Sequence, residues 1–218
     1  LPWNSPIGTL IWKLAPAIAA GNTVVIKPSE RASCSTLELM KILEEADLPE
    51  GLINVVTGFG PTTGAPLIEH QDVRMISFTG GTKGGSAASL SASKNVKPII
   101  MELGGKSPQI IFKDADLTLS VNGVVSGIFP VSGHSCISGS RILVHKDIKD
   151  KFTQNLLEVV KKAKVGHPND TATQIGPIAN KEQYDFILSK IEAAEKRGLK
   201  LLIDGRKEQK SEGYYIGP

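Results

Sequence analysis

Short runs of β-branched and apolar residues recur through the first half of the chain, each bounded by glycine or proline. They cover residues 23–26, 53–56, 75–78 and 99–101. Runs that are this short and apolar on both faces are typical of strands buried in a parallel sheet. Between them, apolar residues adopt helical spacing. This alternation predicts βαβ units, with a parallel sheet covered by helices.

Two of the predicted helices carry signals at their ends. The first, over residues 10–20, is expected to end at Gly21, a common C-cap residue. The second has Ser35 and Glu38 at the spacing of a capping box, and it is expected to stop before Pro49.

The second half continues with strands and helices in alternation. The patterns predict strands at residues 109–112, 141–145 and 199–203, and helices around residues 117–128, 152–163 and 180–191. Asn180 with Gln183 is expected to cap the last of these helices. Residues 207–213 are expected to form a polar loop.

The residues that follow the predicted strands carry the candidate binding chemistry. Ligands of such sheets bind beyond the carboxyl ends of the strands. A Lys-Pro-Ser-Glu segment follows the first strand, and a glycine-rich turn at residues 79–85 opens the helix after the third. Bare backbone N–H groups there can face a phosphate. Taken singly, each feature is better explained as a turn glycine or a surface charge.

Cys136 lies among small residues between a predicted helix and the strand at residues 141–145. On such a loop a thiol is accessible to a ligand. The alternative is a buried, inert cysteine that packs as a small hydrophobe. This loop alone leaves both interpretations open.

Composition excludes few classes of protein. The 218 residues carry 25 basic and 22 acidic side chains, a net charge of +3, which gives no reason to expect nucleic acid or a membrane surface as a partner. No apolar run approaches the roughly 20 residues of a spanning helix. The two cysteines form neither a disulfide framework nor a metal-ligand spacing, so no metal site and a reducing compartment, the cytoplasm, are expected.

Five motifs together resemble those of the aldehyde dehydrogenase superfamily, in order and in spacing. They are Pro2-Trp3-Asn4, Lys27-Pro28-Ser29-Glu30, Phe78-Thr79-Gly80, Glu102-Leu103-Gly104-Gly105-Lys106 and the segment from Gly133 to Cys136.

The resemblance covers essentially the whole chain and implies an α/β fold with a Rossmann-like parallel sheet. Residues 1–103 would form part of an NAD(P)-binding domain, and residues 104–218 part of an α/β catalytic domain. It also implies the central fragment of a longer chain whose parent forms a homodimer or homotetramer. The isolated chain is expected to be inactive and to associate.

The resemblance also implies catalytic roles. Cys136 would be the nucleophile that adds to a small-molecule aldehyde. The side-chain amide of Asn4 and the backbone N–H of Cys136 would stabilise the oxyanion. Glu102 would be the general base that activates water to hydrolyse the thioester.

The implied cofactor is NAD, with NADP as the alternative. Lys27 and Glu30 match positions that bind the adenosine ribose, where a carboxylate favours NAD. Arg31 would instead attract the 2′-phosphate of NADP. The remaining positions implied in cofactor binding are Trp3, Ser29, Phe78, Thr79, Gly80, Gly81 and Gly104.

Three positions depart from the family pattern. Gly81 stands where serine is usual, Gly84 where valine is common, and His134 where glutamine or glutamate is usual. A missing hydroxyl at position 81 would weaken pyrophosphate binding. His134 is expected to be a surface histidine, although an imidazolium there would favour the thiolate of Cys136.

Two alternatives accompany the hydrolytic dehydrogenase. A CoA-acylating relative would pass the acyl group to coenzyme A, but such relatives generally lack the glutamate at position 102. A non-catalytic nucleotide-binding or structural protein is the second alternative, and the presence of Asn4, Lys27, Glu102 and Cys136 together disfavours it.

Overall fold

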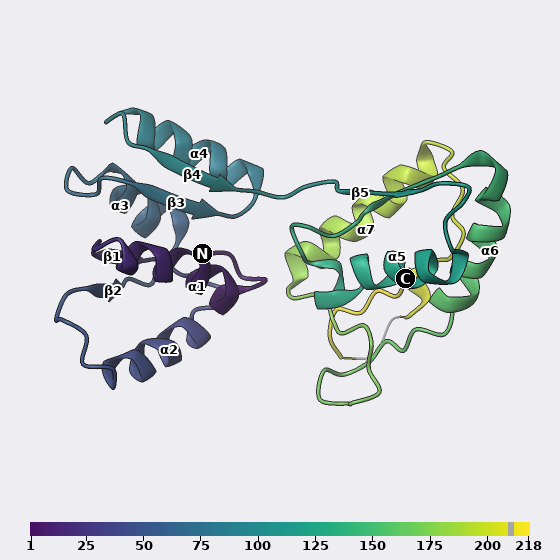
Figure 1. Ribbon diagram of the computed structural model, residues 1–218, viewed down its shortest axis with the longest axis horizontal. Coiled ribbons are helices and arrows are strands. Elements are labelled where there is room, and N and C mark those ends of the chain that lie inside the picture. The colour runs from purple at the N-terminus through teal and green to yellow at the C-terminus, as the bar shows by residue number, and fades with distance from the viewer. Residues whose placement is uncertain (209–211) are drawn as a thin grey trace. The chain divides into compact units, whose positions relative to one another are not determined.

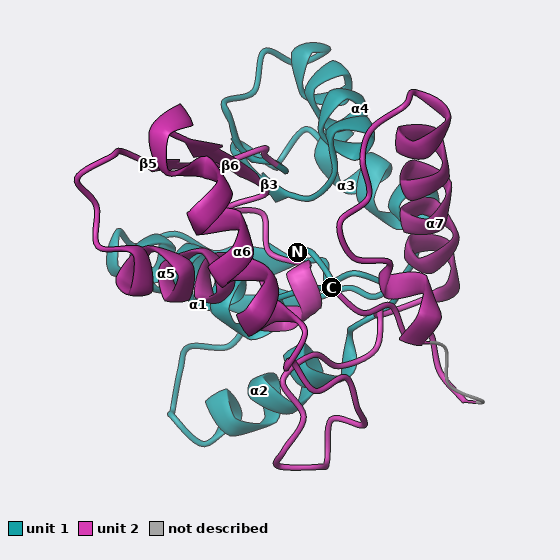
Figure 2. Cartoon of the chain, turned by 90° about the vertical axis from the view of Figure 1, so that its right-hand side faces the viewer, with its two compact units in different colours: residues 1–104 teal, residues 105–218 magenta. Residues whose placement is uncertain are grey.

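The computed structural model describes residues 1–208 and 212–218. The chain divides into two compact units, which Figure 2 distinguishes by colour. Unit 1 comprises residues 1–104 and unit 2 comprises residues 105–218. Of the predicted polar loop at residues 207–213, residues 209–211 lie outside the described part of the chain.

Unit 1 alternates helices and strands as predicted (Figure 1). In chain order its elements are α1 (Pro6–Ala19), β1 (Val24–Ile26), α2 (Cys34–Glu44), β2 (Ile53–Val55), the π-helical turn η1 (Gly60–Gly64), α3 (Ala65–Glu69), β3 (Ile76–Thr79), α4 (Thr82–Ser93) and β4 (Ile99–Glu102).

The strands of unit 1 form two parallel pairs. In the first, β1 pairs with β2, with Ile26 opposite Val55. In the second, β3 pairs with β4, with Thr79 opposite Glu102. The predicted parallel, Rossmann-like α/β architecture is confirmed, although each pair is a separate two-stranded ladder within the described residues.

Helix α1 begins four residues earlier than predicted. Pro6 occupies its first turn, where the missing N–H costs no hydrogen bond. Leu10 and Leu14 are buried against Ile26 of β1, which gives unit 1 its core. The predicted end is confirmed, because the N–H of Gly21 donates to the Ile18 carbonyl at 2.8 Å with φ at +77°.

The predicted capping box of α2 is wrong. The helix begins at Cys34 with Ser33 as its N-cap residue, and no side chain caps it. Ser35 therefore lies within the first turn, where it cannot serve as the N-cap. The carboxylate of Glu38 instead pairs with Lys41 one turn later, at 2.7 Å.

Unit 2 is built around one parallel pair of strands with helices against it. Its elements are β5 (Pro108–Ile111), α5 (Leu117–Ile128), the 3₁₀ turn η2 (Pro130–Gly133), β6 (Arg141–Val144), the 3₁₀ turn η3 (Lys146–Ile148), α6 (Lys149–Val160), α7 (Lys181–Lys196) and the 3₁₀ turn η4 (Gly205–Glu208).

Helix α5 provides the connection between the two parallel strands. Its N-cap residue Asp116 accepts a hydrogen bond from the Leu119 N–H at 2.8 Å, so the helix start is fixed by a side chain. Val121 and Val124 of this helix are buried with Phe152 of α6. The two helices thereby cover one face of the β5–β6 pair.

The capping prediction for α7 is confirmed, and the strand predicted just beyond this helix is wrong. The side chain of Asn180 accepts from the Gln183 N–H at 3.0 Å. Residues 199–203 pair with no strand in the described structure. An apolar run becomes a strand only where another strand completes its hydrogen bonds, and here Leu199 and Leu202 remain exposed.

Within the described residues, no helix is long and apolar enough to cross a membrane. The same part of the chain contains no group of three or more His, Cys, Asp or Glu side chains placed to hold a metal ion.

Candidate active site

The site of unit 1 is formed at the carboxyl ends of its strands. Lys27 follows β1 directly, Thr79 ends β3, and Glu102 ends β4 opposite Thr79. The Gly80 N–H donates to the Glu102 carbonyl at 3.1 Å, which extends the ladder by one bond beyond the strand ends. The backbone of the predicted site residues is therefore held by the sheet itself.

Lys27 and Glu30 lie beside one another. The ammonium of Lys27 donates to the Pro28 carbonyl at 2.8 Å and is 3.7 Å from the nearer carboxylate oxygen of Glu30. Only 15% of the Lys27 side chain is exposed, against 38% for Glu30. A Cβ at Gly64 would be 3.3 Å from Cδ of Lys27, so a glycine there leaves room for the lysine stem.

The glycine-rich turn after β3 is shaped by the ring of Phe78. A Cβ at Gly80 would lie 2.9 Å from the Phe78 ring, and one at Gly84 would lie 3.2 Å from it. Gly84 therefore has a packing reason to differ from the family pattern. A Cβ at Gly81 would meet nothing within 4 Å, and nothing in the structure explains the glycine at that position.

The turn places the first residues of α4 next to the ends of β3 and β4. Gly81 is the N-cap of α4, and the helix begins at Thr82. A Cβ at Gly85 would lie 2.7 Å from the Leu103 side chain, so α4 approaches the end of β4 closely because residue 85 has no side chain. Bare N–H groups and the positive end of the helix dipole make this turn suited to an anion.

Lys13 is an additional residue near Glu102, and the sequence analysis missed it. Its ammonium donates to the Ser77 hydroxyl at 2.6 Å. Burial lowers the pKa of Lys13, and the Glu102 carboxylate opposes that shift. The available signal was a single lysine among the apolar residues of α1. The Glu102 side chain itself is exposed, so water can reach it.

Trp3 and Asn4 precede Ser5, the N-cap residue of α1, and are both half-buried. They and Glu102 belong to unit 1, whereas Cys136 belongs to unit 2. Ser29 follows β1, and its hydroxyl accepts from the Arg31 N–H at 3.3 Å, which forms the turn after Lys27.

Cys136 of unit 2 is exposed on a loop before β6. The loop follows three consecutive residues in the left-handed region, Val131, Ser132 and Gly133, with φ of +55°, +51° and +75°. This conformation is unfavourable for a β-branched valine, so surrounding contacts must hold it. One of them is the bond from the Ser132 hydroxyl to the Gly176 carbonyl, at 3.1 Å.

His134 lies within this turn and is half-buried, which differs from the surface position predicted for it. Its Nδ1 is 2.9 Å from the Val131 carbonyl, and its backbone N–H donates to the same oxygen at 3.0 Å. Burial lowers the pKa of His134, and the Val131 carbonyl partly opposes the shift. The ring is therefore a neutral donor near pH 7, and an imidazolium beside the thiol is disfavoured.

The backbone of Gly105 passes close to the loop that carries Cys136. A Cβ at Gly105 would lie 3.2 Å from the Cys136 carbonyl oxygen, whereas one at Gly104 would meet nothing within 4 Å. A side chain at Gly105 would therefore crowd the loop that carries Cys136, whereas unit 1 leaves room for a side chain at Gly104.

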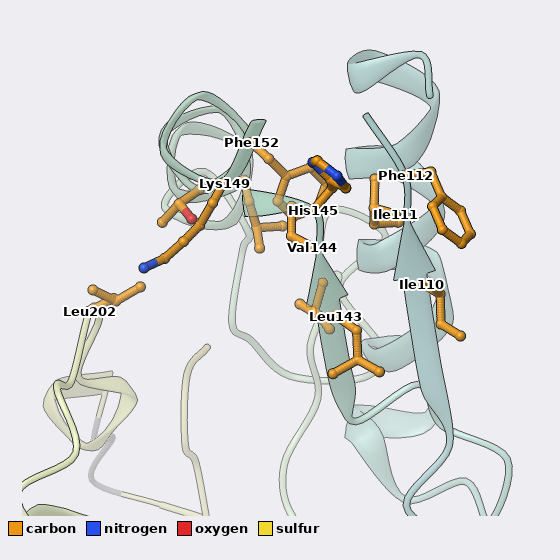
Figure 3. Close-up of a pocket in the computed structure, with 12 residues that line it drawn as sticks. Ile110, Ile111, Phe112, Leu143, Val144, His145, Lys149, Phe152 and Leu202 are labelled. Atoms are coloured by element: carbon orange, nitrogen blue, oxygen red, sulfur yellow. The ribbon is translucent and has the colours of Figure 1, made fainter. Parts of the chain in front are cut away.

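A groove of about 580 Å³ in unit 2 is separate from these residues (Figure 3). Its lining is largely apolar and comes from β5, β6 and α6 together with Leu202. None of the predicted site residues lines it. The groove therefore supplies apolar surface and no candidate chemistry.

Unit 1 is a parallel α/β unit with a lysine–glutamate pair, a glycine turn and a carboxylate at its strand ends, as in many nucleotide-binding enzymes. Unit 2 has an accessible thiol on a fixed loop, which is typical of enzymes that use covalent catalysis. All 218 residues match the model of the aldehyde dehydrogenase family. The chain belongs to this family.

Similar proteins support this family assignment. The chain is 42% identical over 218 residues to the chloroplastic betaine aldehyde dehydrogenase of Atriplex hortensis, covering all of this chain and 43% of that protein. It is 44% identical over 219 residues to aldehyde dehydrogenase 1A1 of Gallus gallus, with the same coverage. The chain thus spans less than half the length of these relatives.

Solved structures show the same fold. PnpE from Pseudomonas sp. WBC-3, which was also solved with nicotinamide adenine dinucleotide, matches with a TM-score of 0.95 and 41% identity. A mutant betaine aldehyde dehydrogenase of Staphylococcus aureus in complex with NAD+ matches with a TM-score of 0.97 and 39% identity. Each match covers all of this chain and 45% of the other.

Proposed function

We propose that this chain is the central portion of an NAD-dependent aldehyde dehydrogenase that oxidises a small-molecule aldehyde to a carboxylic acid. One observation carries the proposal. The exposed thiol of Cys136 lies on a loop held by side-chain hydrogen bonds, in a chain that belongs to the family over its whole length.

The first step uses the thiol. The thiolate of Cys136 adds to the carbonyl carbon, a C–S bond forms, and the carbonyl electron pair moves to oxygen. The side-chain amide of Asn4 and the backbone N–H of Cys136 donate to this oxyanion. NAD, held by residues such as Glu30 and the glycine turn, would supply the hydride acceptor for the same carbon, and loss of that hydride would leave the carbon as the thioester of Cys136.

The second step uses the carboxylate. Glu102 takes a proton from a water molecule as that water attacks the thioester carbon, and the C–S bond then breaks to release the acid and the thiol. Glu102 is suited to this role because its side chain is exposed at the end of β4, where water reaches it. Lys13 supplies a positive charge near this carboxylate.

The residues of unit 1 fit NAD. The Glu30 carboxylate, steered by Lys27 at 3.7 Å, would accept hydrogen bonds from the two ribose hydroxyls. The glycine turn offers the bare N–H groups of the first turn of α4 to the pyrophosphate. Solved relatives were crystallised with this cofactor. The other proposed cofactor residues are Trp3, Ser29, Phe78, Thr79, Gly80 and Gly104.

In this proposal residues 1–103 serve the cofactor and residues 104–218 carry the thiol, and the complete enzyme is a homodimer or homotetramer in a reducing, cytoplasmic compartment. The two cysteines are both free, as such a compartment requires.

The test compares the two cysteines in the full-length enzyme. We expect Cys136→Ala to abolish aldehyde-dependent NADH formation while the Kd for NAD, measured by fluorescence titration, stays within about twofold, because no nucleophile replaces the thiol. Cys34→Ala is the matched control, since Cys34 is also exposed but starts helix α2. Activity that survives Cys136→Ala and is lost with Cys34→Ala would overturn the proposal.

A further inference from the structure

The side chain of Gln109 contacts the loop that carries Cys136. Gln109 is the second residue of β5. Its amide nitrogen donates to the Gly139 carbonyl at 2.8 Å and lies 3.4 Å from the Val124 carbonyl in α5. Both partners are acceptors, so the amide acts here only as a donor.

Two glycines make this contact sterically possible. A Cβ at Gly139 would lie 2.4 Å from the amide nitrogen of Gln109, and a Cβ at Gly127 would lie 3.0 Å from its amide oxygen. Any side chain at Gly139 would therefore displace the Gln109 amide. The glycine at position 139 thus allows the observed contact, and the glycine at position 127 leaves the Gln109 amide in place without a close approach.

Gly139 is fixed through both of its backbone polar groups. Its N–H donates to the Gly127 carbonyl of α5 at 2.9 Å, and its carbonyl accepts from Gln109. Gly139 is buried, while Cys136, three residues earlier, is exposed. The loop between them is closed by the bond from the Ser138 N–H to the Ser135 carbonyl at 3.2 Å.

We propose that Gln109 is a positioning residue for the nucleophile: through Gly139 it fixes the direction in which the backbone N–H of Cys136 points. This inference rests on the proposed role of Cys136. The N–H stabilises an oxyanion only if it is already aimed at that oxygen, and a displacement of about 1 Å costs on the order of 100-fold in rate. Gln109 itself touches no substrate.

Two reagents, applied to the full-length enzyme, separate positioning of the Cys136 N–H from simple exposure of the thiol. With p-nitrophenyl acetate, the thiolate forms a C–S bond through a tetrahedral oxyanion, and the C–O bond breaks to release p-nitrophenolate. With iodoacetamide, the thiolate displaces iodide and no oxyanion forms. The measured quantity is the ratio of acylation to alkylation rate constants at Cys136, followed by peptide mass spectrometry. Cys34 serves as the reference thiol in the same molecule.

The variant Gln109→Glu keeps the size of the side chain and replaces its donor by an acceptor that faces two carbonyls. We expect the Cys136 ratio to fall at least about tenfold, because the oxyanion donor is displaced while the thiol stays accessible. Alkylation of Cys136 and both reactions of Cys34 should change less than about twofold.

Gln174→Glu is the matched control. The side-chain oxygen of Gln174 accepts from the Lys164 N–H at 3.0 Å, so a glutamate there keeps the bond that Gln109→Glu loses. We expect this variant to show the wild-type ratio. Gln109→Met, which has neither a donor nor a charge, should show the same fall as Gln109→Glu and replaces it if that variant does not fold.

Three results would overturn the inference. An unchanged ratio in a folded Gln109→Met or Gln109→Glu protein would show that Gln109 does not position the nucleophile. Parallel changes in acylation and alkylation would assign it a purely structural role. A wild-type ratio at Cys136 no higher than that at Cys34 would instead remove Cys136 as the nucleophile, and the proposed function would fail with it.

Discussion

Unit 1 presents its candidate residues at the ends of paired strands, whereas unit 2 presents Cys136 on a loop before β6. In unit 1 the ladder bonds continue into the site, as between the Gly80 N–H and the Glu102 carbonyl. In unit 2 the loop is held at Ser132 and at Gly139 by single side chains that reach backbone carbonyls.

This difference separates two ways of placing chemistry on an α/β fold. The hydrogen bonds of the sheet fix the backbone of residues at the strand ends, so many contacts determine the position of each such residue. A loop has no such ladder, and its geometry depends on a few polar side chains and on glycines that allow a close approach. We therefore expect single substitutions near the loop to alter chemistry more than binding, and those of the cofactor residues at the strand ends to alter binding or stability. Glu102 is the exception among the strand-end residues, because its side chain has a proposed catalytic role.

The largest expected effect concerns Glu102. In the full-length enzyme, Glu102→Gln keeps the shape of the side chain and removes its basicity, so deacylation should become rate-limiting. General-base assistance is worth about 10²–10⁴-fold, and the steady-state rate should fall by that amount after an NADH burst near one per active site.

Stopped-flow absorbance measures the burst, and added coenzyme A is the control. If the acyl group is transferred to water, coenzyme A should not restore turnover. Restored turnover would favour the CoA-acylating alternative, and an unchanged steady-state rate would exclude Glu102 as the base.

The next effect concerns stability at the glycine turn of unit 1. Gly80→Ala places a Cβ 2.9 Å from the Phe78 ring, whereas Gly81→Ala meets nothing within 4 Å. Overpacking costs about 1–3 kcal/mol, so Gly80→Ala should be less stable than Gly81→Ala by this amount. Urea denaturation gives the difference. Equal stabilities would mean that the Phe78 ring does not constrain the turn.

A smaller effect concerns cofactor choice. A charge-assisted hydrogen bond from the ribose to Glu30 should give the wild-type enzyme a kcat/KM for NAD roughly tenfold above that for NADP. Glu30→Gln should narrow this gap. Arg31→Gln should widen it, because it removes the positive charge available to a 2′-phosphate. A wild-type preference for NADP would contradict the role of Glu30.

The smallest effect concerns pH and His134. Burial lowers the pKa of His134 below its ordinary value of 6.5 in the folded protein, so the unfolded chain binds a proton first as the pH falls. The free energy of unfolding should therefore decrease as the pH drops from 6.5 toward the lower folded value, and this contribution is fully present above 6.5.

His134→Asn should remove this part of the pH dependence. An asparagine amide nitrogen occupies the place of Nδ1, so it keeps the bond to the Val131 carbonyl and cannot titrate. Urea denaturation of both proteins across this pH range gives the difference, in which the other histidines cancel. Identical slopes would show that His134 is protonated equally in both states.

The six strands from β1 to β6 were predicted to within one residue at each end, because β-branched runs between glycines and prolines leave few other structures. The helix ends were less well predicted. Residues 33–36 are Ser-Cys-Ser-Thr, and sequence alone did not distinguish Ser33 from Ser35 as the N-cap residue of α2.

The hydrogen bonds of the loop could not be predicted. Gln109 looks like an ordinary polar residue in a strand, and its role appears only once β5, α5 and residue 139 lie together. Residues 199–203 show the converse, because their pattern is typical of a strand, yet they pair with no strand in the described structure.

The most direct test of the central claim is to identify the acylated residue. The full-length Glu102→Gln enzyme is mixed with an aldehyde and NAD, quenched within the burst, digested and analysed by mass spectrometry. The account predicts an acyl group, heavier than the free thiol by the mass of the aldehyde less two hydrogens, on the peptide that contains Cys136. The peptide that contains Cys34 should be unmodified. An acyl group on Cys34, or an NADH burst with no acylated cysteine, would contradict the account.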